Sequence, residues 1–254
     1  MMCGIIGIAS NKPVSINIIN SLKKLEYRGY DSAGLATLNN MEINEKKCSG
    51  RVEELEKILF KNPTDGNLGI GHVRWATHGV PNTINAHPHS SEIVSVVHNG
   101  IIENSDELKK GLENKGLKFK SQTDTEVITL LITEELKNSE PVTAVFKILK
   151  QLKGSFALGI IFKDYQDIII GARRGSPLAV GYSKGENYLG SDSYALKSMT
   201  NKISYLDDGD LCVMSKDKID FYDNKEKKIN KKVYTLSDDE NISDKGDYKN
   251  FMSK

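Results

Sequence analysis

The chain opens with Cys3-Gly4-Ile5-Ile6-Gly7-Ile8-Ala9, an apolar run headed by a thiol. If the two preceding methionines are removed, Cys3 becomes the first residue. Its free α-amine, with a pKa of about 7.7–8.0, could then take the thiol proton at neutral pH, so one residue would supply both nucleophile and base. A cysteine near the start of a strand is also a common small core residue. The run predicts a buried strand and leaves both interpretations of the thiol open.

Length and charge set broad limits on the class of protein. The chain has 254 residues, a formal net charge of +1 and 38% hydrophobic residues, which suits one large domain or two small ones. Neither nucleic acid nor a membrane is implied as a partner. No apolar stretch approaches the roughly eighteen residues that cross a bilayer, and the first residues lack the pattern of a signal peptide. We therefore expect a cytoplasmic protein.

The cysteines support the same expectation. Cys3, Cys48 and Cys212 are odd in number and widely spaced, and they form no C-x-x-C pair. This pattern favours neither a disulfide framework nor a thiolate zinc site. A reducing compartment fits it.

Apolar periodicity predicts the elements of the first hundred residues. A strand at the start is followed by an amphipathic helix over 15–26, and an Asn39-Asn40 turn predicts a hairpin. A short helix follows near Val52. Strands are expected over 68–75 and 93–97, and each runs into polar residues, 77–79 and 98–100, where sites are often built.

The second half predicts helices and then strands. Thr123 and Glu126 form a capping-box pattern that starts a helix near Asp124, and Pro141 opens another helix that ends at Gly154. Strands are expected over 157–162 and 168–172, with further antiparallel strands over 205–222. Helices thus come in pairs between strand pairs, which predicts an α+β fold of two antiparallel sheets with helices outside. From Asp223 the chain turns polar, so we expect a domain over 3–222 and a linker-like extension over 223–254.

All histidines lie in one short stretch: His72, His78, His87, His89 and His98. The clustering suits imidazole ligands, but there is no H-E-x-x-H and the only carboxylate in the stretch is Glu92. No metal is therefore predicted. Histidines that bond loop backbone around strand ends are the preferred interpretation.

A cysteine nucleophile also needs oxyanion donors and a grip on its substrate. Asn99-Gly100 offers a side-chain amide beside a sterically open backbone N–H, although such a pair is equally a turn. Arg74 could bind a carboxylate through both arms of its fork and Asp124 an ammonium, so together they would fit an α-amino acid. Each alone is more often a surface ion-pair partner.

Six motifs follow one another along the chain: Cys3-Gly4-Ile5-Ile6-Gly7, Glu26-Tyr27-Arg28-Gly29-Tyr30-Asp31-Ser32-Ala33-Gly34, Gly71-His72-Val73-Arg74-Trp75-Ala76-Thr77-His78-Gly79, Asn85-Ala86-His87-Pro88-His89, His98-Asn99-Gly100-Ile101-Ile102-Glu103-Asn104 and Thr123-Asp124-Thr125-Glu126. Together they strongly resemble the class II glutamine amidotransferase domain, and the resemblance runs over nearly the whole chain. More narrowly, they resemble the glutaminase half of the glutamine–fructose-6-phosphate aminotransferases.

The resemblance implies an N-terminal-nucleophile fold, a four-layer αββα sandwich, and it implies residue roles without a cofactor. Cys3 would attack the amide carbon of L-glutamine, and Asn99 and Gly100 would hold the oxyanion. Trp75 would resemble a gate for ammonia, and Arg28 would lie near the nucleophile in a role that the resemblance leaves open. The amino-acid end of glutamine would be bound by Arg74, Thr77, His78 and Asp124.

The resemblance also implies partners and raises alternatives. Family members continue into sugar isomerase domains that bind fructose 6-phosphate and through which a homodimer would form, and this chain holds the glutamine half only. A retained Met2 would leave a silent glutamine-binding or regulatory module, and another N-terminal-nucleophile amide hydrolase is a third reading. Arg173-Arg174 is the only basic loop worth weighing as a phosphate site, and a solvated loop is the preferred interpretation.

Overall fold

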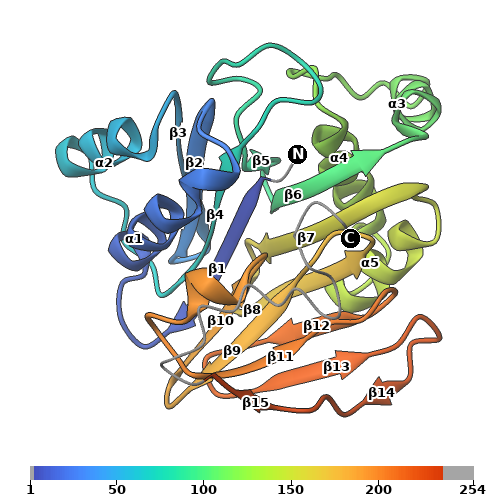
Figure 1. The fold of residues 1–254 in the computed structure, drawn as a ribbon. Coiled ribbons are helices and arrows are strands. Elements are labelled where there is room, and N and C mark those ends of the chain that lie inside the picture. Colours follow the sequence, from blue (N-terminus) through green and yellow to red (C-terminus); the bar gives the residue numbers. More distant parts are fainter. Residues whose placement is uncertain (1–2, 237–254) are drawn as a thin grey trace, which may run out of the picture.

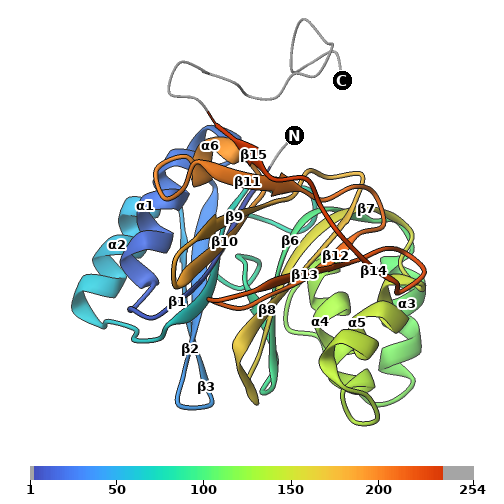
Figure 2. The same ribbon diagram turned by 90° about the horizontal axis from the view of Figure 1, so that it is seen from below.

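The computed structural model describes residues 3–236, which form two antiparallel β-sheets between two layers of helices (Figures 1 and 2). This arrangement confirms the predicted α+β fold with four layers. Figure 2 shows the two sheets side by side, with α1 and α2 on one side and α3, α4 and α5 on the other.

The first sheet has eight strands and includes the N-terminal run in its interior. From edge to edge the strands are β15 (Tyr234–Thr235), β11 (Lys202–Tyr205), β9 (Ala179–Ser183), β10 (Glu186–Gly190), β1 (Gly4–Ser10), β4 (Leu68–Arg74), β2 (Ser32–Asn39) and β3 (Glu42–Ser49).

The second sheet has seven strands. From edge to edge they are β14 (Lys228–Ile229), β13 (Ile219–Tyr222), β12 (Leu211–Met214), β8 (Tyr165–Arg174), β7 (Gly154–Phe162), β6 (Val94–Ile102) and β5 (His89–Ser90).

Helices cover the outer face of each sheet. The first sheet carries α1 (Ser15–Leu25), followed by the short 3₁₀ helix η1 (Glu26–Arg28), and α2 (Val52–Lys61) and α6 (Ser193–Leu196). The second side carries α3 (Ser105–Glu113), α4 (Asp124–Glu135) and α5 (Pro141–Leu149). Within the described residues, no helix is long and apolar enough to span a bilayer.

The layering explains why the N-terminal run is apolar at almost every position. Successive side chains of a strand point to opposite faces. Ile5 and Ala9 therefore pack in the core between the two sheets, whereas Ile6 and Ile8 pack against the helices. Because β1 is covered on both faces, its sequence is a continuous run rather than an alternating one.

One predicted strand end is wrong, and the difference matters for the site. The strand expected over 93–97 continues to Ile102, so Asn99-Gly100 lies inside β6 and not in a loop after it. The reason is pairing: β7 runs antiparallel beside β6 as far as the pair Ile102 and Gly154. Gly100 has a φ of 132°, and a Cβ there would lie 2.0 Å from the carbonyl oxygen of Ser155. Glycine is therefore required by the close approach of β7.

The capping box is also wrong, although α4 begins at Asp124 as predicted. The Thr123 side chain makes no cap hydrogen bond to the helix, and its hydroxyl lies 2.9 Å from Nε2 of His89. The Glu126 carboxylate accepts from the backbone N–H groups of Lys120 and Ser121, at 2.8 and 2.6 Å. Glu126 therefore ties the chain before the helix instead of closing a cap.

The expected extension contributes strands to both sheets. β14 pairs with β13, and β15 pairs with β11 at the edge of the first sheet. Residues 228–229 and 234–235 therefore belong to the sheets. The remainder of the extension, 237–254, lies outside the described residues. A division of the chain into an amidotransferase domain and a linker stays a proposal.

Candidate active site

Strand ends from both sheets meet at the thiol. Cys3 directly precedes β1, and the neighbouring β4 ends at Arg74. The backbone N–H of Trp75 donates to Sγ of Cys3 at 3.2 Å. From the other sheet, Nδ2 of Asn99 on β6 donates to the carbonyl oxygen of Cys3 at 2.9 Å. Residues that are 72 and 96 positions apart from Cys3 thus surround it.

A cavity of about 670 Å³ opens beside the thiol. Six of the residues expected to act in catalysis, binding or support line it: Cys3, Arg28, Trp75, Thr77, Asn99 and Gly100. Five further lining residues were not expected from the sequence: Ile101, Glu103, Ser155, Ser176 and Pro177. This volume suits a small ligand.

The thiol lies in a partly buried environment. Burial raises the pKa of Cys3 above its ordinary value, and the hydrogen bond from Trp75 and the charge of Arg74 act in the opposite direction without reversing it. The thiol therefore stays protonated near neutral pH, and a nucleophilic role requires a base.

Arg28 links the backbone of Cys3 to the carboxylate of Asp192. Its Nε donates to the carbonyl oxygen of Cys3 at 3.1 Å, and its Nη1 forms a buried ion pair with Asp192 at 2.6 Å. The hydroxyl of Tyr27 donates to the same carboxylate at 2.5 Å. Gly29 lets this segment approach β4, because a Cβ there would lie 2.6 Å from the Arg74 carbonyl. Arg28 thus fixes the backbone that carries the thiol.

Arg74 is the last residue of β4, and one of its two terminal guanidinium nitrogens makes no hydrogen bond among the described residues. Its Nη2 donates to the carbonyl oxygens of His78 and Gly79, the second at 3.4 Å. Its Nη1 is buried and has no hydrogen-bond partner among residues 3–236. Burial lowers the pKa of this guanidinium, and the nearby Asp31 carboxylate opposes the shift. A buried cationic donor without a partner indicates a place for an anion.

Thr77, His78 and Asp124, which were also expected to bind the amino-acid end of glutamine, differ in where they lie relative to the cavity. Thr77 lines the cavity, and its hydroxyl is 3.3 Å from Nδ1 of His78. Asp124 is buried at the start of α4, accepts from the N–H of Ile102 at 2.8 Å and contributes to the field at Arg74. His78, Arg74 and Asp124 are not among the lining residues of the cavity.

The remaining histidines form a buried layer rather than a set of loop contacts. His72, His87, His89 and His98 are all buried, and the rings of His72 and His87 pack at a tilt of 36° with centroids 4.2 Å apart. The hydroxyl of Thr125 lies 2.7 Å from His87 Nε2 and 3.0 Å from His98 Nδ1. Within the described part of the chain, no group of three or more His, Cys, Asp or Glu side chains could hold a metal ion.

Arg173 and Arg174 are the last two residues of β8, not part of a loop as the sequence had suggested, and both bind protein groups. Arg174 donates to the carbonyl oxygens of Leu152 and Leu149 at 2.8 and 3.2 Å, where α5 ends. Arg173 donates to the Leu206 carbonyl, and its Nε lies 3.4 Å from Asp208. These contacts account for the pair structurally, and the loop that follows supplies Ser176 and Pro177 to the cavity.

Sequence reasoning missed Asp192, Asp31 and Ser155. Asp31 lies within a quoted motif, and its carboxylate accepts from the N–H of Ala76, which fixes the chain after Arg74. Asp192 and Ser155 carry no local signal. Ser155 reaches the site because β7 pairs it with Ile101, and Asp192 does because β10 lies beside β1.

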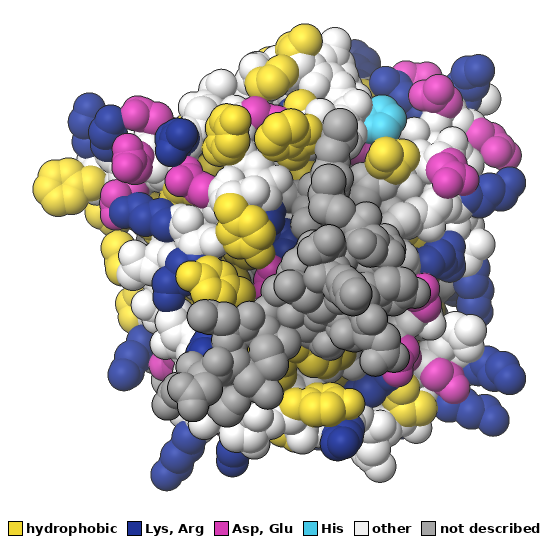
Figure 3. Space-filling model, in the orientation of Figure 1, with side chains coloured by type: hydrophobic (Ala, Val, Ile, Leu, Met, Phe, Trp, Pro, Cys, Tyr) yellow, Lys and Arg dark blue, Asp and Glu magenta, His cyan; other side chains and the backbone are white. Residues whose placement is uncertain are grey.

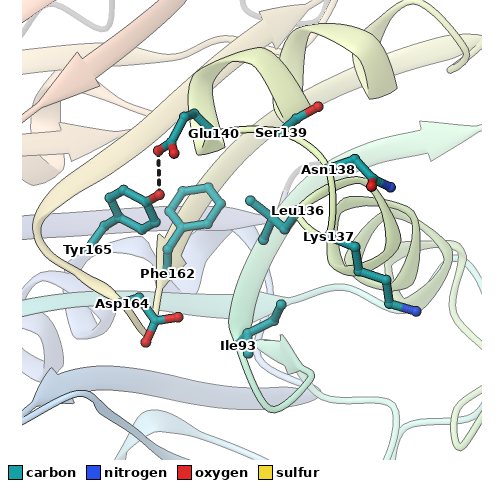
Figure 4. A pocket seen from close by; sticks show the side chains of 9 residues that line it. All are labelled: Ile93, Leu136, Lys137, Asn138, Ser139, Glu140, Phe162, Asp164 and Tyr165. Carbon is teal, nitrogen blue, oxygen red and sulfur yellow. Dashed lines mark hydrogen bonds between the residues drawn. The ribbon is translucent and has the colours of Figure 1, made fainter.

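A second cavity of about 540 Å³ lies near the opposite end of β6 and β7 (Figure 4). It is lined by Ile93, Leu136, Lys137, Asn138, Ser139, Glu140, Phe162, Asp164 and Tyr165. The Tyr165 hydroxyl donates to Glu140, as the dashed line in Figure 4 marks. Lys137 pairs with Glu134 at 2.6 Å. We call it the polar crevice.

Comparison with protein families and relatives agrees with this geometry. The model of a family described as a glutamine amidotransferase domain matches residues 76–198. A glutamine–fructose-6-phosphate aminotransferase (isomerizing) of Mesorhizobium japonicum is 50% identical over 254 residues, which is 100% of this chain and 42% of that protein. The protein of the same name from Zymomonas mobilis is 46% identical over the same shares. The chain thus spans about two fifths of the length of these relatives.

Solved structures show the same fold. A glutamine phosphoribosylpyrophosphate amidotransferase from B. subtilis superposes with a TM-score of 0.77 at 24% identity, over 87% of this chain and 49% of that chain. A glutamine aminotransferase class-II domain protein from Silicibacter pomeroyi superposes with a TM-score of 0.62 at 15% identity, over 87% of this chain and 99% of that chain.

The four layers, with the thiol directly before an inner strand, are those of the N-terminal-nucleophile fold. Residues 76–198 match the glutamine amidotransferase domain, and along its whole length the chain is similar to part of the glutamine–fructose-6-phosphate aminotransferases.

Proposed function

We propose that this chain hydrolyses L-glutamine to glutamate and ammonia through a thioester on Cys3. The observation that carries the proposal is the meeting, in one cavity, of the Cys3 thiol with the Asn99 amide and Gly100, beside the unpartnered Nη1 of Arg74. These are the nucleophile, the oxyanion donors and the anion grip that amide hydrolysis requires.

The chemistry follows from the positions of these groups. The free α-amine of Cys3, once it is the first residue, takes the thiol proton, and Sγ attacks the amide carbon of glutamine. The Asn99 Nδ2–H and the Gly100 N–H stabilise the oxyanion. The C–N bond breaks as the α-ammonium returns the proton to the leaving nitrogen, and ammonia departs. Water then attacks the thioester, which releases glutamate and restores the thiol.

Substrate recognition falls to the residues around Arg74. The Arg74 guanidinium would pair with the α-carboxylate of glutamine, together with Thr77 and His78, and the Asp124 carboxylate would take the α-ammonium. Trp75 is 41% exposed at the rim and contacts Tyr30 edge-on, with ring centroids 6.0 Å apart. This position suits the proposed gate.

Within a longer protein, the ammonia would serve to convert fructose 6-phosphate to glucosamine 6-phosphate. Sugar isomerase domains beyond this chain would bind the sugar and form the homodimer, as the names and lengths of the relatives suggest. We place the protein in the cytoplasm. The chain by itself should release ammonia from glutamine and make no glucosamine 6-phosphate.

Labelling with an electrophilic ketone analogue of glutamine tests the proposal. We expect stoichiometric modification of Cys3 alone, because Cys3 lines the cavity and would carry its own base, whereas Cys48 and Cys212 are buried away from it. Peptide mapping by mass spectrometry identifies the labelled site. Label on Cys48 or Cys212 would contradict the assignment. A Cys3→Ala variant should bind glutamine and release no ammonia.

The intact mass of the purified protein decides between the enzyme and a silent glutamine-binding module. A mass that lacks both methionines leaves the Cys3 amine free, whereas a retained Met2 turns it into a nonbasic amide. Turnover of glutamine against other amides separates a glutaminase from another amide hydrolase of the same fold.

A further inference from the structure

His72 stands between the two sheets at the site, although none of the proposed catalytic steps uses it. It lies on β4 of the first sheet and is fully buried. Its Nε2 lies 3.0 Å from the backbone oxygen of His98 and 3.0 Å from Oδ1 of Asn99, both on β6 of the second sheet. It is therefore the direct link between the strand beside Cys3 and the oxyanion donor.

The contact with His98 determines which nitrogen of the ring carries the proton. A backbone carbonyl oxygen can only accept, so the 3.0 Å contact requires that Nε2 be the N–H donor. Nδ1 is then the bare nitrogen, and it has no hydrogen-bond partner among the described residues. Burial lowers the pKa of His72 to about 3, so the ring is neutral and keeps this single proton at physiological pH.

The tautomer in turn determines how the Asn99 amide faces. An N–H donor on His72 must meet the oxygen of the amide, because Nδ2 in that place would set two donors against each other. Nδ2 then points to Cys3, where it donates to the carbonyl oxygen at 2.9 Å. Nδ2 carries two hydrogens and this bond uses one of them, so the other is left for an oxyanion in the cavity.

The ring itself is held in place. It packs against the tilted ring of His87, whose Nε2 is 2.7 Å from the hydroxyl of Thr125 on α4. A rotation of the His72 ring would disturb this contact and break the bond from Nε2 to the His98 carbonyl. The amide of Asn99 is thus oriented before substrate arrives, which is the condition under which an oxyanion donor is most effective.

We propose that His72 is a positioning residue: its Nε2–H holds the Asn99 side chain so that the amide nitrogen, and not the oxygen, faces the reacting carbon of glutamine. This inference rests on the proposed glutaminase function. Without the donor from His72, only the bond from Nδ2 to the Cys3 carbonyl would oppose rotation of the amide, and the rotated form would present an oxygen to the developing negative charge.

The test compares glutamine hydrolysis by the wild type, His72→Phe, Asn99→Ala and the double variant. Phenylalanine keeps a ring in the buried site and removes the donor. We expect His72→Phe to lower kcat by roughly ten- to a hundredfold with KM within about twofold, because orientation of an oxyanion donor acts on the transition state. In the Asn99→Ala background, the same change should lower kcat no further.

A second pair of variants provides rescue and a matched control. A glutamine side chain can place its amide nitrogen near the position of Nε2, whereas the shorter asparagine cannot. We expect His72→Gln to keep kcat within about fivefold of the wild type and His72→Asn to resemble His72→Phe. If His72→Phe does not fold, as thermal unfolding would show, the comparison of these two variants decides the question.

Three outcomes would overturn the inference. One is an equal loss of kcat in both Asn99 backgrounds, which would mean a structural role, and another is a rise in KM alone. The third is equal activity of His72→Gln and His72→Asn. A wild-type protein without glutaminase activity would instead refute the proposed function, so the two failures are distinguishable.

Discussion

The cavity at Cys3 and the polar crevice lie near opposite ends of the same strands, β6 and β7, and differ little in volume, about 670 Å³ against about 540 Å³. They differ in how their polar groups are used. In the crevice, Lys137 pairs with Glu134 and Tyr165 with Glu140. At the cavity, Arg74 keeps a buried Nη1 without a partner among the described residues.

This difference shows that volume does not define a site. Lys137, Glu140 and Tyr165 in the crevice have partners within the protein, so a ligand that binds them would have to displace contacts that already exist. Beside the cavity, buried groups lack partners, and a ligand that supplied them would remove a desolvation cost. The face drawn in Figure 3 carries several exposed hydrophobic side chains. Charged side chains, Lys137 and Glu140 among them, line the crevice.

The largest effect should come from the ion pair that supports the cavity. Asp192→Ala leaves the buried Arg28 guanidinium without its carboxylate, and removing one partner of a buried pair costs about 3–5 kcal/mol of unfolding free energy. Urea unfolding measures this loss. The matched control is Asp164→Ala at the crevice, where an exposed aspartate should cost within about 0.5 kcal/mol. Equal losses for the two variants would contradict the comparison.

The oxyanion donor should come next. Asn99→Ala removes the side-chain amide that faces Cys3, and the loss of one such donor costs about 10²–10³-fold in kcat, or about 2.7–4 kcal/mol. Glutamine affinity should change less. Steady-state kinetics separate the two effects, and a collapse of affinity with unchanged turnover would make Asn99 a substrate-binding residue instead.

Arg74→Lys should have a smaller effect that appears in KM. Lysine keeps the positive charge but loses the planar fork, so the α-carboxylate would be held less well, and KM should rise roughly tenfold with kcat nearly unchanged. The loss of the contacts to the His78 and Gly79 carbonyls contributes as well. A fall in kcat at constant KM would place Arg74 in the chemistry rather than in binding.

The smallest effect is expected at the polar crevice. Tyr165→Phe removes the hydroxyl that donates to Glu140, and both kcat and KM for glutamine should stay within about twofold of the wild type. The same assay used for Asn99→Ala measures this. A large change in kcat or KM would show that the crevice affects catalysis at the other end of β6 and β7, which would contradict the comparison.

The sequence by itself determined the elements whose signals are local. The apolar run 3–9 predicted β1, and helical spacing predicted a helix over 15–26, where α1 covers 15–25, because burial of one face or both is encoded in neighbouring residues. The nucleophile, the oxyanion pair and Arg74 were also named from residue chemistry and from a family resemblance. The structure brings the nucleophile and the oxyanion pair together at one cavity, which Arg74 does not line, and the roles of all of them stay predictions.

Tertiary structure alone decided where β6 ends, which way the Asn99 amide faces and what holds Arg28. β6 continues past residue 97 because β7, more than fifty residues away, pairs with it. Asn99 is oriented by His72 from the other sheet, and Arg28 is held by Asp192 at a separation of 164 residues. These contacts join segments distant in sequence, and no local periodicity or propensity records which distant group will arrive. Only the packing of the two sheets does.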